Sequence, residues 1–170
     1  MDLKAYIRDI PNFPEPGILF RDITPLLQEP KAFRCVVDRL RERYQDEAVD
    51  TIVAVESRGF LFGAPLAYQM GKALVPVRKR GKLPASTYTT EYSLEYGSSA
   101  MEIHTDGLEP GQRVLLLDDL LATGGTLAAT ARLVEICGGV VVGVGVVIEL
   151  TELQGRRRLK DYDVFSLIEY

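Results

Sequence analysis

Residues 114–126 constrain the possible folds of this 170-residue chain more than any other stretch. They begin with four apolar residues, continue with Asp118 and Asp119, and reach two glycines within a run of small residues. An uninterrupted apolar run of this kind is typical of a strand buried on both faces, as in the core of a parallel sheet. The segment therefore predicts a buried strand, followed by a glycine loop that opens a helix.

The loop has the composition of a phosphate site. Gly124 and Gly125 allow the backbone to turn its N–H groups toward one point, and the next helix adds its positive N-terminal end. Thr123 and Thr126 supply hydroxyls. Carboxylates repel a phosphate, so the two aspartates must serve another part of the ligand, such as ribose hydroxyls or Mg²⁺. The residues alone thus indicate a sugar-phosphate site without naming a reaction.

Two commoner nucleotide motifs are excluded. No lysine follows the glycines, so the loop is not that of an ordinary nucleoside triphosphatase. Gly143 and Gly145 begin a dinucleotide-binding pattern, but Ile148 stands where the third glycine belongs.

Helical and strand patterns alternate along the chain and predict an α/β fold: an open, mostly parallel twisted sheet with helices on both faces. Asp2 is a candidate cap for a first helix over residues 3–10. Further helices are expected over 33–44, over 62–70 and after the glycine loop, and strands over 51–55, 74–78, 140–150 and 164–168.

Composition narrows the class of protein. A formal net charge of −4 disfavours nucleic acid as a partner, and the apolar stretch 138–148 is too short to span a bilayer. No signal peptide is recognisable, and the two cysteines are expected to be reduced, so we expect a cytoplasmic protein without membrane or nucleic-acid partners. No repeat or linker divides residues 1–170, which predicts a single domain.

Three motifs follow predicted strands at the edge where ligands of parallel sheets bind. They are Glu56-Ser57-Arg58, the basic run at 78–82 and the glycine loop with its aspartates. After the basic run, aromatic and polar residues alternate over 88–96, which favours a β-hairpin that acts as a flap.

Residues 114–126 resemble the 5-phosphoribosyl 1-pyrophosphate (PRPP) signature of type I phosphoribosyltransferases. Four further segments are similar to adenine phosphoribosyltransferases, in the same order, and the resemblance covers nearly the whole chain. These segments read FRDITP at 20–25, ESRGF at 56–60, RKRGKLP at 78–84 and YSLEYG at 92–97.

The resemblance implies a Mg²⁺-dependent purine salvage enzyme that converts adenine and PRPP to AMP and pyrophosphate. It also implies a homodimer, with an N-terminal hood over about residues 1–30 and a flexible flap over residues 78–97. Mg²⁺ would be carried by PRPP, with no direct protein ligand.

The same resemblance assigns the site residues. It implies a non-proline cis peptide at Glu56–Ser57, and a role for Arg78 that reaches the partner subunit's diphosphate. The assignments are Glu95 as the catalytic residue; Ala122, Thr123, Gly124, Gly125 and Thr126 for the 5-phosphate; Asp118 and Asp119 for the ribose; Glu56, Ser57, Arg58, Arg78 and Lys82 for pyrophosphate; and Leu19, Phe20 and Arg21 for adenine.

Two alternatives stay open. One is a phosphoribosyltransferase for another base, namely xanthine, hypoxanthine/guanine or orotate. The other is a regulator that keeps the fold to sense PRPP without turnover, as purine-responsive repressors do. The acidic charge balance, the short segment before the first sheet strand and the retained Glu95 disfavour the second.

Overall fold

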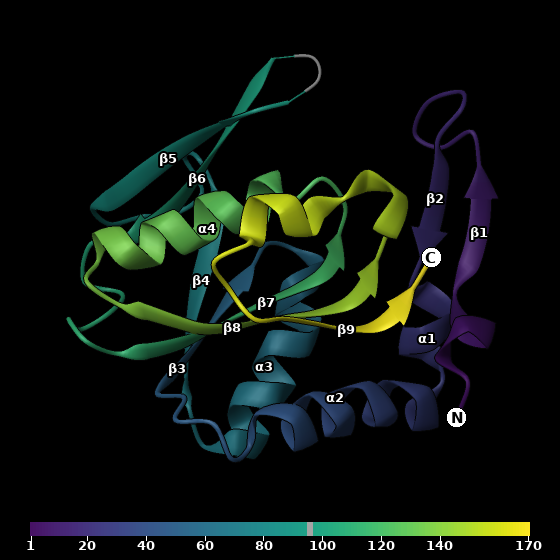
Figure 1. The fold of residues 1–170 in the computed structure, drawn as a ribbon, viewed down its shortest axis with the longest axis horizontal. Helices are drawn as coiled ribbons and strands as arrows, with labels where there is room; N and C mark the ends of the chain where they lie inside the picture. The colour runs from purple at the N-terminus through teal and green to yellow at the C-terminus, as the bar shows by residue number, and fades with distance from the viewer. Residues whose placement is uncertain (95–96) are drawn as a thin grey trace.

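The computed structural model describes residues 1–94 and 97–170. At its centre is a seven-stranded sheet in the order β5-β6-β4-β3-β7-β8-β9 (Figure 1). Strands β4, β3, β7, β8 and β9 run parallel, whereas β6 and β5 are added antiparallel at one edge. The bounds are β3 Thr51–Val55, β4 Ala73–Lys79, β5 Thr87–Ser93, β6 Ser98–His104, β7 Arg113–Leu121, β8 Val140–Glu149 and β9 Val164–Glu169.

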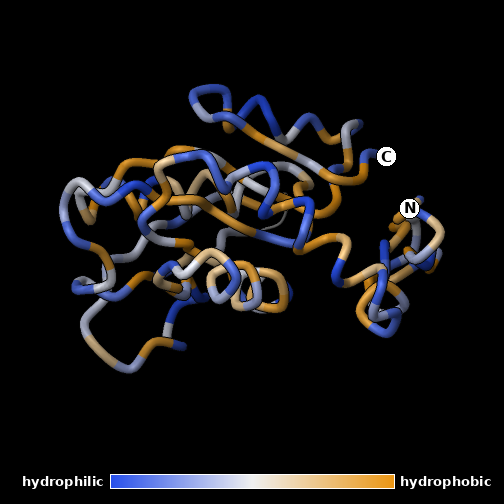
Figure 2. Tube along the Cα trace, turned by 90° about the horizontal axis from the view of Figure 1, so that it is seen from below, coloured by the Kyte–Doolittle hydropathy of each residue, from blue (hydrophilic) through white to orange (hydrophobic). Residues whose placement is uncertain are grey.

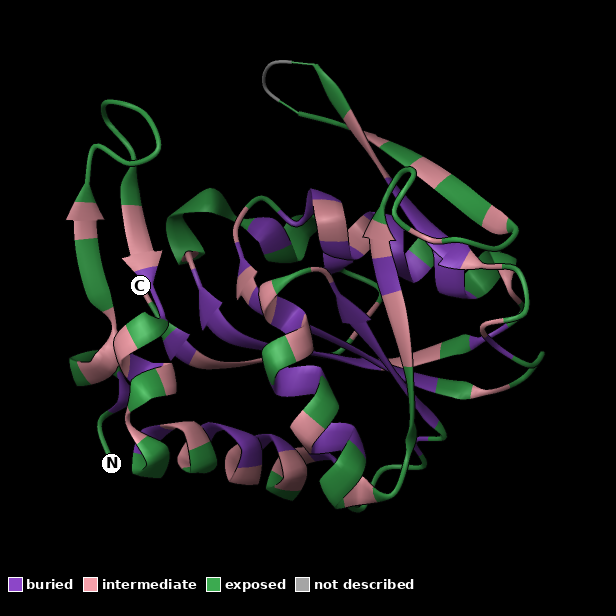
Figure 3. Cartoon of the chain, turned by 180° about the vertical axis from the view of Figure 1, so that it is seen from behind, coloured by how far each residue is buried: buried purple, intermediate pink, exposed green. Residues whose placement is uncertain are grey.

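Helices cover both faces of this sheet, which confirms the expected fold class, and the buried strands lie between the helical layers (Figure 3). The alternation of side chains gives each layer its own core. Ile52 and Leu117 pack in the layer of α2 and α3, whereas Val53 and Leu116 pack in the layer of α4. The helices are α1 Thr24–Gln28, α2 Pro30–Tyr44, α3 Arg58–Met70 and α4 Gly125–Ile136, with short 3₁₀ turns η2 Thr151–Leu153 and η3 Gly155–Leu159.

The N-terminal segment is set apart from the main sheet (Figure 2). The helix expected over residues 3–10 is wrong: a single 3₁₀ turn, η1 Leu3–Tyr6, is capped by Asp2, and a hairpin follows, made of β1 Arg8–Pro11 and β2 Leu19–Asp22. Apolar residues at helical spacing misled because the backbone of β1 finds its hydrogen-bond partners in β2 instead. Among the apolar residues of this pattern only Leu3 is buried.

Two helices begin earlier than their apolar patterns predict. Pro30 opens α2, where its fixed φ suits the first turn and the Glu29 side chain accepts from Lys31 N. Helix α3 begins at Arg58 rather than at residue 62, and it ends as expected at Gly71, whose φ of 62° is left-handed. The early start of α3 places Arg58 at the carboxyl end of β3.

Asp22 ties the hairpin to the body of the protein. Its Oδ1 accepts from Thr24 N at 2.9 Å and from Thr24 Oγ1 at 2.6 Å, while Oδ2 accepts from Arg8 Nε at 2.9 Å. The bonds from Thr24, with that from Arg8, lower the pKa of Asp22 to about 2. One carboxylate thus joins both strands of the hairpin to the start of α1.

We expect Asp22→Asn to lower the free energy of unfolding by about 1 kcal/mol at pH 7, because a neutral amide accepts less strongly than a carboxylate. Because the folded pKa lies below the unfolded value, the loss is full above about pH 4 and fades as the pH falls toward 2. Urea unfolding at pH 7, 4 and 2.5 measures it, with the exposed Asp46→Asn as control. A loss that is independent of pH would contradict this account.

Candidate functional site

The carboxyl ends of β3 and β7 meet the start of α4 around a cleft of about 250 Å³. The flap hairpin β5–β6 lies over one side of this region, above α4 (Figure 1). The cleft brings together residues that are far apart in sequence, beyond the carboxyl ends of parallel strands, where ligands of open α/β sheets bind. Of the predicted site residues it gathers Glu56, Ser57, Arg58, Asp118, Asp119 and the whole loop from Ala122 to Thr126.

Residues 122–126, called the phosphate loop here after the ligand that the sequence predicts for them, connect β7 to α4. Gly124 is the N-cap of α4 with a φ of 85°, a conformation that glycine adopts without a steric penalty. The loop therefore directs the amides of the first turn of α4 toward the cleft, with the positive end of the helix dipole behind them. An anion with several oxygens fits this arrangement.

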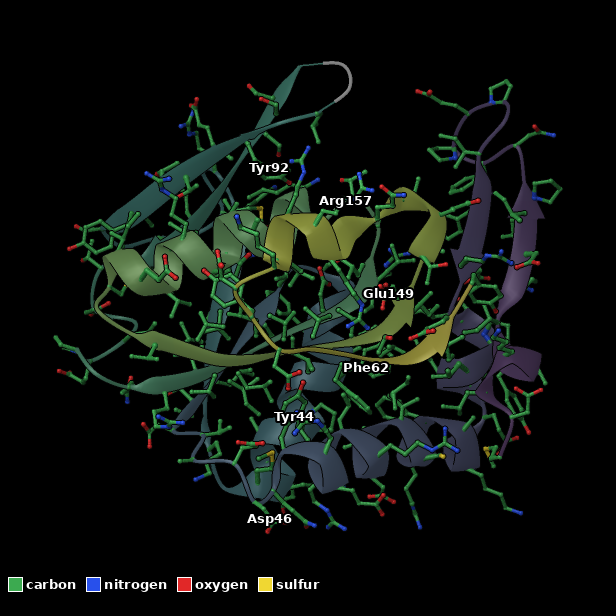
Figure 4. All side chains as sticks on the ribbon, in the orientation of Figure 1. Tyr44, Asp46, Phe62, Tyr92, Glu149 and Arg157 are labelled. Carbon is green, nitrogen blue, oxygen red and sulfur yellow. The ribbon has the colours of Figure 1, made fainter. Side chains whose placement is uncertain are left out.

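The flap is hydrogen-bonded to the phosphate loop. The Tyr92 hydroxyl of β5 lies 3.0 Å from Thr126 Oγ1, and the ring stands where a side chain at Gly125 would be. Figure 4 shows Tyr92 on the flap, above the helix that the loop opens. Tyr92 is one of the alternating aromatic residues that predicted the flap, but the sequence did not show which of these rings contacts the phosphate loop.

Asp118 and Asp119 belong to β7 itself, which continues to Leu121. Both are buried, with exposed fractions of 8% and 5%. Asp119 N donates to Asp118 Oδ1 at 2.8 Å, and Arg58 Nε lies 2.8 Å from Asp119 Oδ2. No described residue makes an aligned hydrogen bond to that Oδ2, so the buried oxygen can still accept from a ligand hydroxyl.

Burial raises the pKa of both aspartates. The pKa of Asp118 lies well above its ordinary value, because burial is reinforced by the charge of Asp119. The pKa of Asp119 is also raised by burial, and the guanidinium of Arg58 opposes the shift. The pair is therefore costly to ionise until hydroxyl donors or a cation reach it.

Arg58 connects two parts of the site. Its guanidinium contacts Asp119 on one side and lies 5.2 Å from the centre of the Phe20 ring on the other. The Glu56–Ser57 peptide just before it is cis, as the resemblance implies. Strand β3 and helix α3 thus deliver a cation between the aspartates and the N-terminal hairpin.

The structure does not place Arg78 and Lys82 on the cleft. Arg78 Nη2 lies 3.4 Å from Glu56 Oε2, and Arg78 Nη1 donates to Lys82 O at 3.3 Å. Glu56 also accepts from Lys79 N. Lys82 follows Gly81, whose φ is 83°, and its side chain is exposed. Arg78 lies near the end of β4, and Lys82 lies on the connection from β4 to β5.

The three residues predicted for the base lie on β2, beside a second hollow of about 470 Å³ that Phe20 and Arg58 both line. The Arg21 side chain is engaged elsewhere: it pairs with Asp9 and stacks 3.7 Å from the centre of the Tyr170 ring. Among the described strands β2 pairs only with β1, so its other edge leaves backbone N–H and C=O groups free. Leu19 is exposed.

Glu95, the predicted catalytic residue, lies outside the described residues, which end at Leu94 and resume at Gly97. The single histidine, His104, lies on β6, where its Nε2 accepts from Ala85 N at 3.4 Å.

Sequence reasoning missed several residues of the cleft. Lys79 lay in the recognised basic run, but its position at the end of β4 distinguishes it only in three dimensions. Leu120, on β7 just after the aspartates, lines the cleft although its apolar character suggested only a core role. Other lining residues that were not predicted are Leu94, Met101, Leu121 and Leu127.

The donors on the cleft suit a hard cation that is shared with a ligand. Mg²⁺ prefers oxygen ligands and retains water or substrate phosphate oxygens in its shell. Asp118 and Asp119 supply such oxygens, and within residues 1–94 and 97–170 no group of three or more His, Cys, Asp or Glu could hold a metal. None of the described helices is both long and apolar enough to span a membrane.

Comparison with known proteins places this geometry in a family. The model of the phosphoribosyl transferase domain matches residues 23–170. An adenine phosphoribosyltransferase of Chloroflexus aurantiacus is 58% identical, covering 99% of this chain and 98% of that protein. The structure of the enzyme from Thermoanaerobacter pseudethanolicus is 53% identical, with a TM-score of 0.97 over 99% of this chain and 98% of its own.

A structure from Saccharomyces cerevisiae, determined with adenine and an imino-altritol bisphosphate, is 41% identical, with a TM-score of 0.92 over 98% of this chain and 96% of its own. These matches extend over nearly the full length of both proteins. The strand ends, the glycine loop and the buried aspartates of this chain therefore lie within a known architecture. The chain belongs to the adenine phosphoribosyltransferases of the phosphoribosyl transferase family.

Proposed function

We propose that this chain transfers the 5-phosphoribosyl group of PRPP to adenine and releases AMP and pyrophosphate, a purine salvage reaction. One observation carries the proposal: a glycine loop at a helix N-terminus and two buried aspartates share one cleft, in a chain whose relatives are adenine phosphoribosyltransferases. A phosphate and a polyhydroxylated sugar need these two features next to each other.

The 5-phosphate is assigned to the phosphate loop, where Ala122, Thr123, Gly124, Gly125 and Thr126 offer amides and hydroxyls. The ribose hydroxyls are assigned to the buried Asp118 and Asp119, and Asp119 Oδ2 has no aligned hydrogen bond to any described residue. Hydrogen bonds from these hydroxyls stabilise the ionised carboxylates, so binding relieves the cost of burying them.

The diphosphate is assigned to the opposite side of the cleft. Arg58 and the Glu56–Ser57 peptide line the cleft, Arg78 lies near the end of β4, and Lys82 lies on the connection from β4 to β5. When Mg²⁺ is bound, it neutralises charge on the diphosphate, and we assign it to PRPP oxygens near the aspartates. We further propose that residues 78–97 close over the diphosphate and exclude water.

Adenine is assigned to the hollow beside β2. The Phe20 ring stacks on the purine, and backbone groups of Leu19 and Arg21 distinguish an exocyclic amino group from a carbonyl. Purine N9 forms a bond to C1′ as the bond from C1′ to the diphosphate breaks, and the N9 proton leaves. Glu95 is proposed to hold or accept that proton. Positioning supplies most of the remaining catalysis.

We also propose a single domain with residues 1–30 as a hood, and a homodimer in which Arg78 approaches the partner subunit's diphosphate. The two free thiols, Cys35 and Cys137, support a reducing compartment such as the cytoplasm.

A competition assay tests the proposed reaction. Purified protein with PRPP and Mg²⁺ receives equal concentrations of adenine, hypoxanthine, guanine and xanthine, and nucleotide products are separated by chromatography. We expect AMP to exceed every other nucleotide by more than about 100-fold, because an oxopurine leaves polar groups of the base site unpaired, a defect that costs up to about 10⁴-fold or more. Preference for an oxopurine would contradict the base assignment, and PRPP binding without any nucleotide product would favour a regulator.

The buried aspartates predict opposite effects of one substitution on stability and on activity. Because the folded pKa of Asp118 is raised, the folded chain binds the extra proton and stability falls as the pH rises from about 3.8. We therefore expect Asp118→Asn to raise the free energy of unfolding by about 1 kcal/mol at pH 7, and to add nothing below about pH 4. Urea unfolding across this range measures the effect.

The same variant is expected to lower kcat/KM for PRPP about 10- to 100-fold, the value of a hydrogen bond to a charged group. The exposed Asp106→Asn serves as a control for both measurements. Loss of stability at pH 7 together with full activity would contradict the assignment of Asp118.

A further inference from the structure

The segment after β8 packs its backbone directly against the phosphate loop. A Cβ at Gly155 would lie 2.4 Å from the carbonyl oxygen of Ala122, and one at Gly124 would lie 2.5 Å from the carbonyl oxygen of Gly155. Side chains do not fit at such distances, so the two backbones touch without an intervening layer. The position of Gly155 therefore limits where the phosphate loop can lie.

The residue after Gly155, Arg156, makes four side-chain hydrogen bonds. Nε and Nη2 of Arg156 donate to the two carboxylate oxygens of Glu149, each at 2.7 Å. Nη1 donates to Val164 O at 2.8 Å, and Nη2 also donates to Ser166 Oγ at 3.2 Å. A planar guanidinium with two parallel bonds to a carboxylate is fixed in orientation as well as in distance.

Glu149 is part of the same strand end as the loop. It is the register partner of Leu121, the last residue of β7 before the phosphate loop, and Leu150 N donates to Leu121 O at 2.9 Å. Its side chain is only 5% exposed. Figure 4 shows Glu149 at the end of β8, below the helical turn that carries Arg157.

The charges of Glu149 and Arg156 neutralise each other, so the pair does not attract a phosphate through a net charge. Arg156 has its carboxylate partner at 2.7 Å, and neither residue lines the cleft. A residue that acted on the phosphate by charge would face the cleft and would carry an unpaired charge. Whatever this pair contributes to binding comes through the placement of Gly155.

We propose that Glu149 and Arg156 are positioning residues for the 5-phosphate: their bidentate ion pair holds Gly155 against residues 122–124, and so sets the loop in its phosphate-binding geometry. This inference rests on the proposed function, because it takes the loop to be the 5-phosphate site.

Calorimetric titration with two separate ligands tests the inference. Ribose 5-phosphate probes the phosphate loop, and magnesium pyrophosphate probes the other side of the cleft. We expect Arg156→Gln to lower the affinity for ribose 5-phosphate about tenfold, the effect of a small displacement of a binding group, and to leave the affinity for pyrophosphate within about twofold. Arg156→Lys retains the charge but not the bidentate geometry, and we expect it to lower the affinity for ribose 5-phosphate about threefold.

A matched control removes another arginine that is paired across the fold. Arg43 of α2 pairs with Glu47 and Asp163, away from the cleft, and Arg43→Gln is expected to leave both affinities unchanged. The inference would be overturned if Arg156→Gln lowered the affinities for both ligands equally, or lowered the melting temperature with both affinities unchanged, because either result shows a merely structural role. If Arg156→Gln does not fold, Arg156→Lys and Glu149→Gln are held to the same criterion.

Failure of the inference and failure of the proposed function give different results. If the unmodified protein does not bind ribose 5-phosphate, the proposed function fails. If it binds, and the Arg156 variants bind equally well, only the positioning role is refuted.

Discussion

The structure depends on two adjacent carboxylates buried at the carboxyl end of β7. A strand covered on both faces carries Asp118 and Asp119 into an apolar interior, where an ionised group is expensive. Only Arg58, among the described cations, forms an ion pair with them. The packing around Asp118 is tight, since a Cβ at Gly59 would lie 3.0 Å from Asp118 Oδ1. The free protein thus retains the free-energy cost of burying these carboxylates, and hydrogen bonds from the hydroxyl groups of a ligand lower that cost.

The parts of the site differ in how firmly the fold holds them. The aspartates lie on the central strand β7, and the phosphate loop follows directly from the end of this strand, which is packed between two apolar cores. The hollow that we propose for the base depends on a two-stranded hairpin that Asp22 joins to α1. The side that we propose for the diphosphate adjoins the β5–β6 hairpin, which contacts the loop through Tyr92 and Thr126. A rigid centre with two peripheral hairpins suits a reaction that binds a sugar phosphate at a fixed point and covers it for the transfer.

The sequence predicted those parts whose signal is local. The apolar run before Asp118 and the glycines after it determine the strand, the loop and the helix, and the structure has all three. The prediction of a helix over residues 3–10 was wrong because the apolar pattern was short and the pairing of β1 with β2 is not local. Arg21 faces Tyr170 across an interval that no sequence spacing encodes, and this contact appears only once the fold brings distant segments together. Arg156 pairs with Glu149, only seven residues earlier, through the 3₁₀ turns after β8, which no apolar periodicity marks.

Direct titration of the aspartate carboxyl groups tests the central claim. Carbon-13 NMR of protein labelled at aspartate side chains reports each carboxyl pKa, with Asp118→Asn and Asp119→Asn used for assignment. In the free protein, we expect both signals to titrate above the ordinary aspartate pKa of 3.8. On saturation with ribose 5-phosphate, we expect both pKa values to fall. Ordinary pKa values in the free protein, or values that the sugar phosphate leaves unchanged, would contradict the central claim.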